Sequence, residues 1–317
     1  MTAALPRMQS PDFAKDLDLT LDELISLLDL ADDLKRDPAQ YRAALAGKSI
    51  ALLFEKPSLR TRLTFELAIQ ELGGFALLNE AQIGGREPLR DVARNLERWF
   101  SGMVARTFHQ KTVDDLAKWS KVPVINALSD LYHPCQALAD MQTIRGHFGV
   151  WRGLKLAFVG DGNNVSHSLM LCAARLGMNF ALAHPVGYEA RPEIIAEARA
   201  LAAVSGAKIE ITNSPEEGVA GAHAVYTDVW ASMGHENEAA ERRTAFANFQ
   251  VDEDLFAGAD SKAVFLHCLP AKRGEEVTDG VMESARSLVF DQAENRLHAQ
   301  KALLIMLLNS PDHGGAA

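Results

Sequence analysis

Cysteine is scarce in this chain, and its pattern excludes two kinds of scaffold. Only three of the 317 residues are cysteine, an odd number, and no two of them form a C-x-x-C pair. Neither a disulfide framework nor a zinc ribbon is therefore expected, and a reducing compartment is indicated. The ten histidines include no H-x-x-x-H or H-E-x-x-H spacing, so the sequence predicts no metal site.

Long hydrophobic runs and an excess of positive charge are also lacking. The longest apolar run, ALLIMLL at residues 302–308, is far shorter than the roughly 20 residues of a membrane-spanning helix. The N-terminal MTAALPRMQSPDF has no apolar core of the kind that secretory signals carry, so a cytoplasmic protein is expected. The formal net charge of −10 argues against a nucleic acid or an anionic membrane as the main partner. It still allows a local basic pocket for a small anion.

The length and the order of the predicted elements indicate two domains of α/β class. A chain of 317 residues suits two domains of about 150 residues each. In both halves short apolar segments alternate with segments of helical period, which is typical of doubly wound domains with mostly parallel sheets. The stretch HFGVWRG interrupts this alternation, so we expect domains at residues 1–147 and 148–317. A C-terminal helix at about 292–309 is predicted to pack back on the first domain.

The segment FEKPSLRTR, residues 54–62, has the features of a phosphate seat at the start of a helix. It follows a short apolar strand, and apolar residues recur at helical spacing after it. The free N–H groups of the first turn and the helix dipole favour an anion there. Ser58 and Thr61 add hydroxyl donors, and Arg60 adds a planar fork that grips two phosphate oxygens. The alternative is an ordinary basic helix start in solvent.

Further polar residues follow the other predicted strands of the first half. Gln82 lies in a loop, Arg106 stands near the end of GMVARTF, and His133 and Gln136 follow VPVINAL. Because ligands of such sheets bind at the carboxyl ends of the strands, we expect these side chains to converge. The His133 imidazole and the Gln136 amide could donate hydrogen bonds to an oxygen that becomes negative in a tetrahedral transition state. A purely structural His133 is the alternative.

The second half carries polar residues after three predicted strands. GDGNNVS resembles a dinucleotide-binding loop, but Val165 stands where the third glycine belongs, so the indication of a nicotinamide cofactor is weak. Asn164 is expected at a helix start, either as a ligand or as a simple N-cap. Asp228 could hold an ammonium group, and Ser232 with the backbone near Met233 could hold an amino-acid head group.

Cys268 stands at the end of the last predicted strand, in HCLPA. A reactive thiol at this place would be a candidate nucleophile. A buried structural thiol is the alternative.

Four segments, FEKPSLRTR, HPCQALAD, DVWASMG and HCLP, have the order and spacing of the ornithine carbamoyltransferases. The chain resembles this family from about Leu19 to Leu308. The resemblance implies transfer of the carbamoyl group of carbamoyl phosphate to the δ-amine of ornithine, which gives citrulline and phosphate in arginine biosynthesis or a urea-cycle-type step. It implies no metal and no organic cofactor, and homotrimers or multiples of trimers whose sites lie between subunits.

The resemblance also implies roles for particular residues. The carbamoyl phosphate group would comprise Ser58, Leu59 through its backbone, Arg60, Thr61, Gln82 from a neighbouring subunit, Arg106, His133, Gln136, Cys268, Leu269 and Arg296. The ornithine group would comprise Asn164, Asp228, Ser232 and Met233. The catalytic group would comprise Arg106, His133, Asp228 and Cys268, with Asp228 and Cys268 at the place where the amine loses its proton.

One position departs from the family pattern, because Leu59 stands where many members have threonine, and its effect on phosphate affinity stays open. DVWASMG, together with a cysteine where the aspartate enzymes have proline, favours ornithine as the acceptor. A carbamoyltransferase for N-acetylornithine or putrescine is the alternative function. A non-catalytic binding protein and a nicotinamide-dependent dehydrogenase are rivals of other classes.

Overall fold

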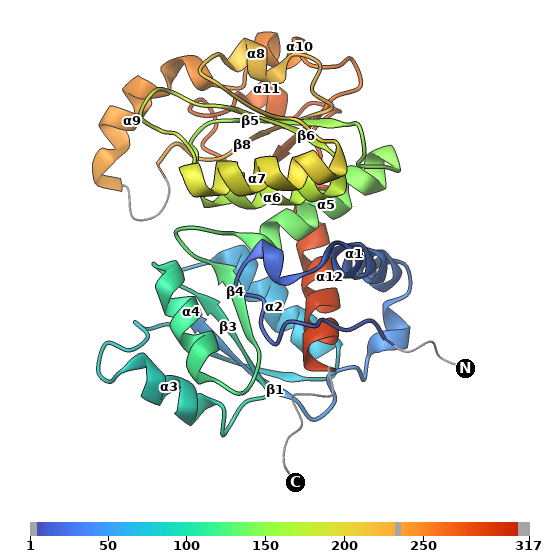
Figure 1. Ribbon diagram of the computed structural model, residues 1–317, viewed down its shortest axis with the longest axis vertical. Helices are drawn as coiled ribbons and strands as arrows, with labels where there is room; N and C mark the ends of the chain where they lie inside the picture. Colours follow the sequence, from blue (N-terminus) through green and yellow to red (C-terminus); the bar gives the residue numbers. More distant parts are fainter. Residues whose placement is uncertain (1–4, 232–235, 310–317) are drawn as a thin grey trace. The chain divides into compact units, whose positions relative to one another are not determined.

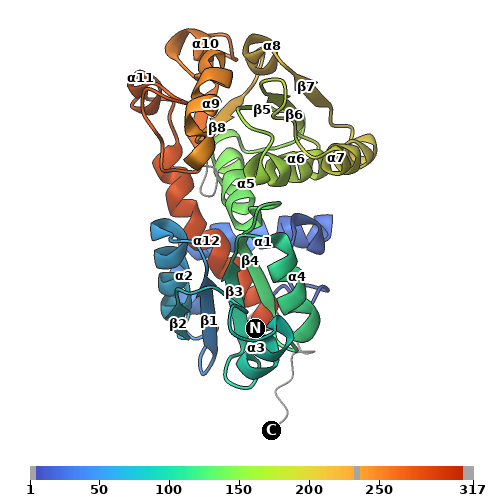
Figure 2. The ribbon, with the colours of Figure 1, turned by 90° about the vertical axis from the view of Figure 1, so that its left-hand side faces the viewer.

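The computed structural model describes residues 5–231 and 236–309, and its contacts divide the chain into two compact units. The first unit comprises the chain up to Gln142 and from Glu294 on, and the second comprises Thr143–Ala293. The boundaries fall within two helices, α5 (Pro134–Phe148) and α12 (Val289–Leu308). Both units combine a sheet with flanking helices (Figures 1 and 2).

The first unit contains a parallel sheet with the strand order β2-β1-β3-β4. Its strands are β1 (Ser49–Phe54), β2 (Phe75–Asn79), β3 (Gly102–Arg106) and β4 (Val124–Leu128). Its helices besides α5 and α12 are α1 (Leu21–Arg36), α2 (Leu59–Glu71), α3 (Leu89–Leu96) and α4 (Gln110–Trp119). The chain passes from β1 to β2 on one side and then to β3 on the other side, so the order of the strands reverses between β1 and β3. In such a topology a ligand is expected in the crevice at the carboxyl ends of these two strands.

The helices of the first unit cover both faces of its sheet. Alternate residues of β1 and β3, such as Leu53 and Met103, pack with Val113 and Leu116 of α4, and α3 lies beside α4 (Figure 1). In the C-terminal part of α12 the Lys301 ammonium pairs with the Glu71 carboxylate of α2. The predicted return of the C-terminal helix to the first domain is therefore confirmed.

The second unit contains a parallel sheet with the strand order β7-β6-β5-β8-β9. Its strands are β5 (Lys155–Val159), β6 (Asn179–Ala183), β7 (Ile209–Thr212), β8 (Ala224–Thr227) and β9 (Val264–His267). Its helices are α6 (Asn164–Leu176), α7 (Pro192–Ser205), α8 (Pro215–Val219), α9 (Ala239–Ala245), α10 (Glu253–Ala257) and α11 (Asp279–Met282). The order reverses between β5 and β8. The prediction of two parallel α/β sheets is confirmed.

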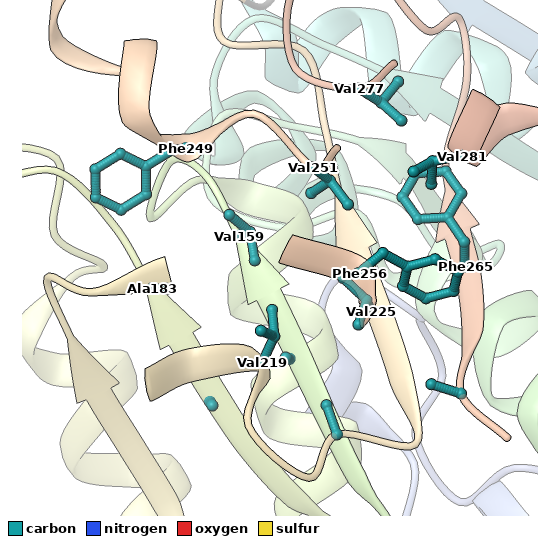
Figure 3. Packing of buried hydrophobic residues seen from close by; sticks show 14 of the residues in the cluster. Val159, Ala183, Val219, Val225, Phe249, Val251, Phe256, Phe265, Val277 and Val281 are labelled. Atoms are coloured by element: carbon teal, nitrogen blue, oxygen red, sulfur yellow. The ribbon is translucent and has the colours of Figure 1, made fainter. Parts of the chain in front are cut away.

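The core of the second unit shows the period of two that strands impose on their side chains. Val159 and Val225 point to one face, where they meet Val219, Phe256 and Phe265 in a packed apolar cluster (Figure 3). On the opposite face α6 and α7 lie side by side (Figures 1 and 2). Both faces of the sheet are thus covered, as is usual for parallel sheets.

Gly162 is required by packing in the loop after β5. A Cβ atom at this position would lie 2.1 Å from the Ala190 nitrogen and 2.3 Å from the Glu189 carbonyl carbon. The Gly162 N–H also donates to the Tyr188 carbonyl oxygen at 2.9 Å. The close approach of two backbone segments therefore explains the second glycine of GDGNN without a dinucleotide.

None of the described helices is long and apolar enough to cross a bilayer.

The N-terminal segment covers the edge strand β4. The Phe13 N–H donates to the Val124 carbonyl oxygen at 2.9 Å, and the Phe13 carbonyl oxygen accepts from the Asn126 N–H at 2.8 Å. The Asp12 Oδ1 atom accepts from the Val124 N–H at 2.8 Å. Burial, opposed by this hydrogen bond and aided by the Asp18 carboxylate, raises the pKa of Asp12 to about 6. Covering the edge in this way removes a row of free backbone groups.

Asp12→Asn should stabilise the first unit at neutral pH. The raised pKa means that the folded state binds the Asp12 proton more tightly than the unfolded state does, so folding loses stability as pH rises from about 4 to about 6. Asparagine keeps the acceptor for Val124 and has no charge, so the free energy of unfolding at pH 7.5 should rise by about 2 kcal/mol while that at pH 4 stays nearly unchanged. Urea denaturation of both proteins at the two pH values measures this. A gain of equal size at both would contradict the assigned role of the Asp12 charge.

Candidate functional site

The segment FEKPSLRTR forms the entrance of α2, directly after β1. Ser58 is the N-cap of the helix, and its Oγ atom accepts from the Thr61 N–H at 3.3 Å. The hydroxyl proton of Ser58 remains available for donation to a ligand. This helix start lies at the β1/β3 reversal, where a ligand is expected from the topology. The geometry fits the anion seat proposed from the sequence.

Arg296 of α12 joins two other segments at this place. Its Nη2 atom donates to the Thr61 Oγ1 atom at 2.8 Å, and its Nη1 atom donates to the Gln136 Oε1 atom at 2.7 Å. Arg106 ends β3 beside Phe54 of β1, and it is buried. Four of the residues predicted from the sequence are thus buried: Thr61, Arg106, Gln136 and Arg296. Arg106 lies at the carboxyl edge of the sheet, and Arg296 joins Thr61 to Gln136.

His133 precedes α5 and is buried in the same unit. Burial and the positive charges of Arg296 and Arg106 hold the pKa of the His133 imidazole well below its usual range. The ring is therefore neutral at physiological pH, so it can offer one N–H donor without a third positive charge.

Leu59 and Gln82 have exposed side chains. Leu59 is the first residue of α2, and its side chain is 69% exposed. Its backbone N–H is one of the N–H groups in the first turn of the helix. Gln82 lies in the loop after β2 and is also exposed.

Asp228 directly follows β8, at the β5/β8 reversal of the second unit. Its Oδ1 atom accepts from the Cys268 thiol at 3.0 Å and from the Val229 N–H at 2.8 Å. Its Oδ2 atom accepts from the Asn163 Nδ2 atom at 3.0 Å. The structure therefore brings together Asp228 and Cys268, which the sequence proposed separately.

The structure corrects the N-cap alternative for Asn164. Asn163 is the N-cap of α6, because its Oδ1 atom accepts from the Val165 and Ser166 N–H groups at 3.0 and 3.1 Å. Asn164 is the first residue within the helix. The cap spacing to Ser166 is a signal that could have identified Asn163 from the sequence.

Ser232 and Met233 lie outside the described residues. The part of DVWASMG that is described is bound by Arg242, whose Nη1 atom donates to the Trp230 carbonyl oxygen at 3.0 Å and to the Asp161 Oδ2 atom at 2.6 Å. Arg242 is itself buried. It therefore ties the segment after β8 to the loop after β5.

His267 and Glu276 support the turn that carries Cys268, and the sequence analysis did not identify them. The His267 Nδ1 atom accepts from the Leu269 N–H at 2.8 Å, and its Nε2 atom lies 3.2 Å from the Glu276 Oε1 atom. Leu269 has a φ of 58° and precedes a cis peptide bond to Pro270. A positive φ is strained for leucine, so the surrounding hydrogen bonds must hold the turn in place.

Asp228, His267 and Cys268 also place three potential metal-ligand atoms within 4.8 Å of one another among the described residues. Both ring nitrogens of His267 already face protein partners, Leu269 and Glu276. Only two groups then remain for a metal ion, whereas a catalytic zinc site uses three protein ligands. The arrangement fits a hydrogen-bonded thiol and carboxylate better than a metal centre.

The fold and the two clusters define a class of protein, in which one parallel α/β domain has two buried arginines near a helix start and the other has a thiol–carboxylate pair. Residues 12–146 match the family model for the carbamoyl-P binding domain of aspartate/ornithine carbamoyltransferase. Residues 152–307 match the model for its Asp/Orn binding domain. The chain belongs to the aspartate/ornithine carbamoyltransferase family.

Individual relatives support the same family over nearly the full length. The chain is 51% identical over 311 residues to the ornithine carbamoyltransferase of Parasynechococcus marenigrum, with 97% of each chain covered. The structure of the ornithine carbamoyltransferase of Pyrococcus furiosus superposes with a TM-score of 0.91 at 47% identity, covering 94% of this chain and 97% of that one. An acetylornithine transcarbamylase in complex with acetylcitrulline superposes with a TM-score of 0.86 at 32% identity, covering 94% and 99%.

Arg60→Ala should weaken the binding of inorganic phosphate at least about tenfold, because a charge-assisted hydrogen bond of this kind contributes roughly 1.5 to 3 kcal/mol. Isothermal titration of the purified protein with phosphate measures the dissociation constant. Arg62→Ala is the matched control, since the Arg62 guanidinium already pairs with Glu66 at 3.1 Å and Glu80 at 3.5 Å. Equal losses in the two variants would contradict a seat built around Arg60.

Proposed function

We propose that this chain transfers the carbamoyl group of carbamoyl phosphate to the δ-amine of L-ornithine, giving L-citrulline and phosphate. The observation that carries the proposal is the Asp228–Cys268 pair in the domain matched by the Asp/Orn model. A carboxylate at this place attracts the cationic side chain of ornithine and repels the side-chain carboxylate of aspartate. Ornithine is therefore the better of the two acceptors that the family name offers.

The proposed reaction begins with attack of the neutral δ-amine on the carbonyl carbon of carbamoyl phosphate. A C–N bond forms, the carbonyl oxygen becomes negative in a tetrahedral intermediate, and the C–O bond to phosphate then breaks. Arg106, His133 and Thr61 would stabilise the oxyanion, with Gln136 and Arg296 holding the carbamoyl phosphate beside them. Arg60, Ser58 and the N–H groups of α2, that of Leu59 included, would take the charge of the leaving phosphate.

The ammonium form of the amine must lose one proton before the attack, by way of the Asp228–Cys268 pair to solvent. The nitrogen loses a second proton after the attack, and this proton leaves with the phosphate as hydrogen phosphate. An alkyl amine of the lysine type has a pKa of about 10.4 in water, so most of it is protonated at neutral pH. Asp228 is the proposed acceptor of the ammonium hydrogen bond, and Cys268 lies next to the same carboxylate. Asn163 and the Val229 N–H fix the carboxylate from its other sides. Asn164, Ser232 and Met233 complete the proposed acceptor site, and Leu269 belongs to the proposed carbamoyl phosphate group.

We place the active form in a homotrimer or a multiple of it. Leu59, Leu63 and Leu67 recur every four residues on α2, and all three are exposed, as are Phe75 and Leu77 of the edge strand β2. Exposed apolar side chains at this spacing favour a protein partner, and a second copy of the chain is the simplest one. Gln82, in the loop after β2, would reach the site of the neighbouring subunit. The citrulline would serve arginine synthesis in the cytoplasm.

A citrulline colour assay with carbamoyl phosphate and four separate acceptors tests the proposed function. Ornithine should give citrulline, and aspartate should give no carbamoylated product. Preferential use of N-acetylornithine or putrescine, detected as loss of carbamoyl phosphate and release of phosphate, would favour the alternative acceptors. If none of the four acceptors causes release of phosphate from carbamoyl phosphate, the proposal is overturned.

Asp228→Asn should raise the Michaelis constant for ornithine at least about tenfold and leave that for carbamoyl phosphate within about twofold, because the change removes one charge and keeps the shape. Steady-state kinetics with each substrate varied in turn measures both constants. Equal increases in the two constants would mean that Asp228 maintains the fold of the second unit instead of holding the acceptor.

Leu63→Glu should disrupt the proposed subunit contact, because a carboxylate buried in an apolar interface loses its hydration without a partner. Sedimentation equilibrium should show a shift from trimer toward monomer. Leu21→Glu is the matched control, since Leu21 of α1 is 41% exposed and Leu63 is 45% exposed. An unchanged assembly in both variants would exclude the α2/β2 surface as the interface.

A further inference from the structure

Asp140 is a buried carboxylate one helical turn after Gln136 on α5. The two side chains are 0% and 1% exposed. The Gln136 Nε2 atom donates to the Asp140 Oδ1 atom at 2.7 Å. At the other end of the same amide, the Oε1 atom accepts from the Arg296 Nη1 atom at 2.7 Å. The amide is therefore bonded at both ends by charged groups.

The charges at the two ends allow only one orientation of the Gln136 amide. A guanidinium group donates hydrogen bonds and accepts none, so it requires the amide oxygen. An ionised carboxylate accepts and does not donate, so it requires the amide nitrogen. If the amide turned by half a rotation, its nitrogen would face Arg296 and its oxygen would face Asp140, and both contacts would become repulsive.

The same orientation extends to the anion seat through Arg296. While its Nη1 atom is held by Gln136, its Nη2 atom donates to the Thr61 Oγ1 atom in the first turn of α2. Asp140, Gln136, Arg296 and Thr61 thus form a continuous chain of hydrogen bonds from α5 through α12 to α2. A loss at the Asp140 end would release the amide and loosen the guanidinium that it holds.

A second glutamine on α5 provides an internal comparison. Gln142 also donates from its Nε2 atom to a carboxylate, Asp32 of α1, at 2.9 Å. Its Oε1 atom is buried, and among the described residues it meets no hydrogen-bond donor. This pair has the same chemistry as Gln136 and Asp140, but among the described residues its Gln142 amide is bonded at the nitrogen end only.

We propose that Asp140 is a positioning residue for carbamoyl transfer, which fixes the Gln136 amide and, through it, Arg296 and Thr61. The inference rests on the proposed function. Asp140 is fully buried, and its effect is transmitted through Gln136. The amide nitrogen of Gln136 keeps a second hydrogen, which remains available for carbamoyl phosphate.

Asp140→Leu and Asp140→Asn separate positioning from packing. Leucine fills a similar volume without an acceptor, whereas asparagine keeps an oxygen for the Gln136 nitrogen. The kcat/KM for carbamoyl phosphate should fall at least about thirtyfold in Asp140→Leu and less than about fivefold in Asp140→Asn. The KM for ornithine should stay within about twofold in both variants. Asp32→Leu, the matched control at the Gln142 pair, should leave kcat/KM within about threefold.

A double-mutant cycle with Gln136→Ala tests whether Asp140 acts through the amide. Any loss caused by Asp140→Leu or Asp140→Asn should disappear when Gln136 is already replaced. If circular dichroism shows that Asp140→Leu does not fold, the cycle with Asp140→Asn decides alone. A loss that persists in the Gln136→Ala background, or an equal fall in the Asp32→Leu control, would overturn the proposal.

The wild-type protein separates this inference from the proposed function. Absence of citrulline from the wild type would overturn the function, and with it the reaction that Asp140 is said to support. An active wild type whose Asp140→Leu variant keeps full kcat/KM would overturn the role of Asp140 alone.

Discussion

Arg296 carries a permanent positive charge into the interior of the first unit, and the arrangement of its anion seat depends on how that charge is accommodated. A buried guanidinium must have its donors used, because leaving them without acceptors or taking the charge out of water unpaired is strongly unfavourable. Thr61 and Gln136 supply acceptors from two different helices. The hydrogen bonds of the Arg296 side chain therefore hold α2, α5 and α12 together.

The charge of the cluster explains its suitability for a phosphorylated ligand. Arg296 and Arg106 are both buried, and burial of His133 together with these two positive charges lowers the pKa of the His133 imidazole. The imidazole is therefore neutral, since a third positive charge would be repelled by the two arginines. In the proposed function, the two buried positive charges would attract the phosphate group of the ligand.

In the second unit the charge that must be accommodated is negative. Asp228 presents a negative charge at the end of β8, and three donors hold it: the Cys268 thiol, the Asn163 amide and the Val229 N–H. The turn that brings Cys268 there contains Leu269 at a positive φ, supported by the buried His267 and Glu276. A rigid carboxylate next to a thiol is suited to a cationic amine that must be held and then deprotonated.

The class of fold, the places where strands end and most of the polar groups at those ends could be predicted from the sequence alone. Apolar runs and helical periods are local properties, and the rule that ligands bind at the carboxyl ends of parallel strands turns them into a list of candidate residues. Which of these candidates contact one another depends on how the elements pack in the folded chain. The bond from Arg296 to Thr61 joins residues 235 positions apart, and that from Cys268 to Asp228 joins residues 40 apart. Asp140 and His267 stand within HPCQALAD and HCLP, and the bond from Gln136 to Asp140 spans only one helical turn. The sequence does not show that these two residues and Glu276 are buried, because burial is decided by the packing of helices and strands around them.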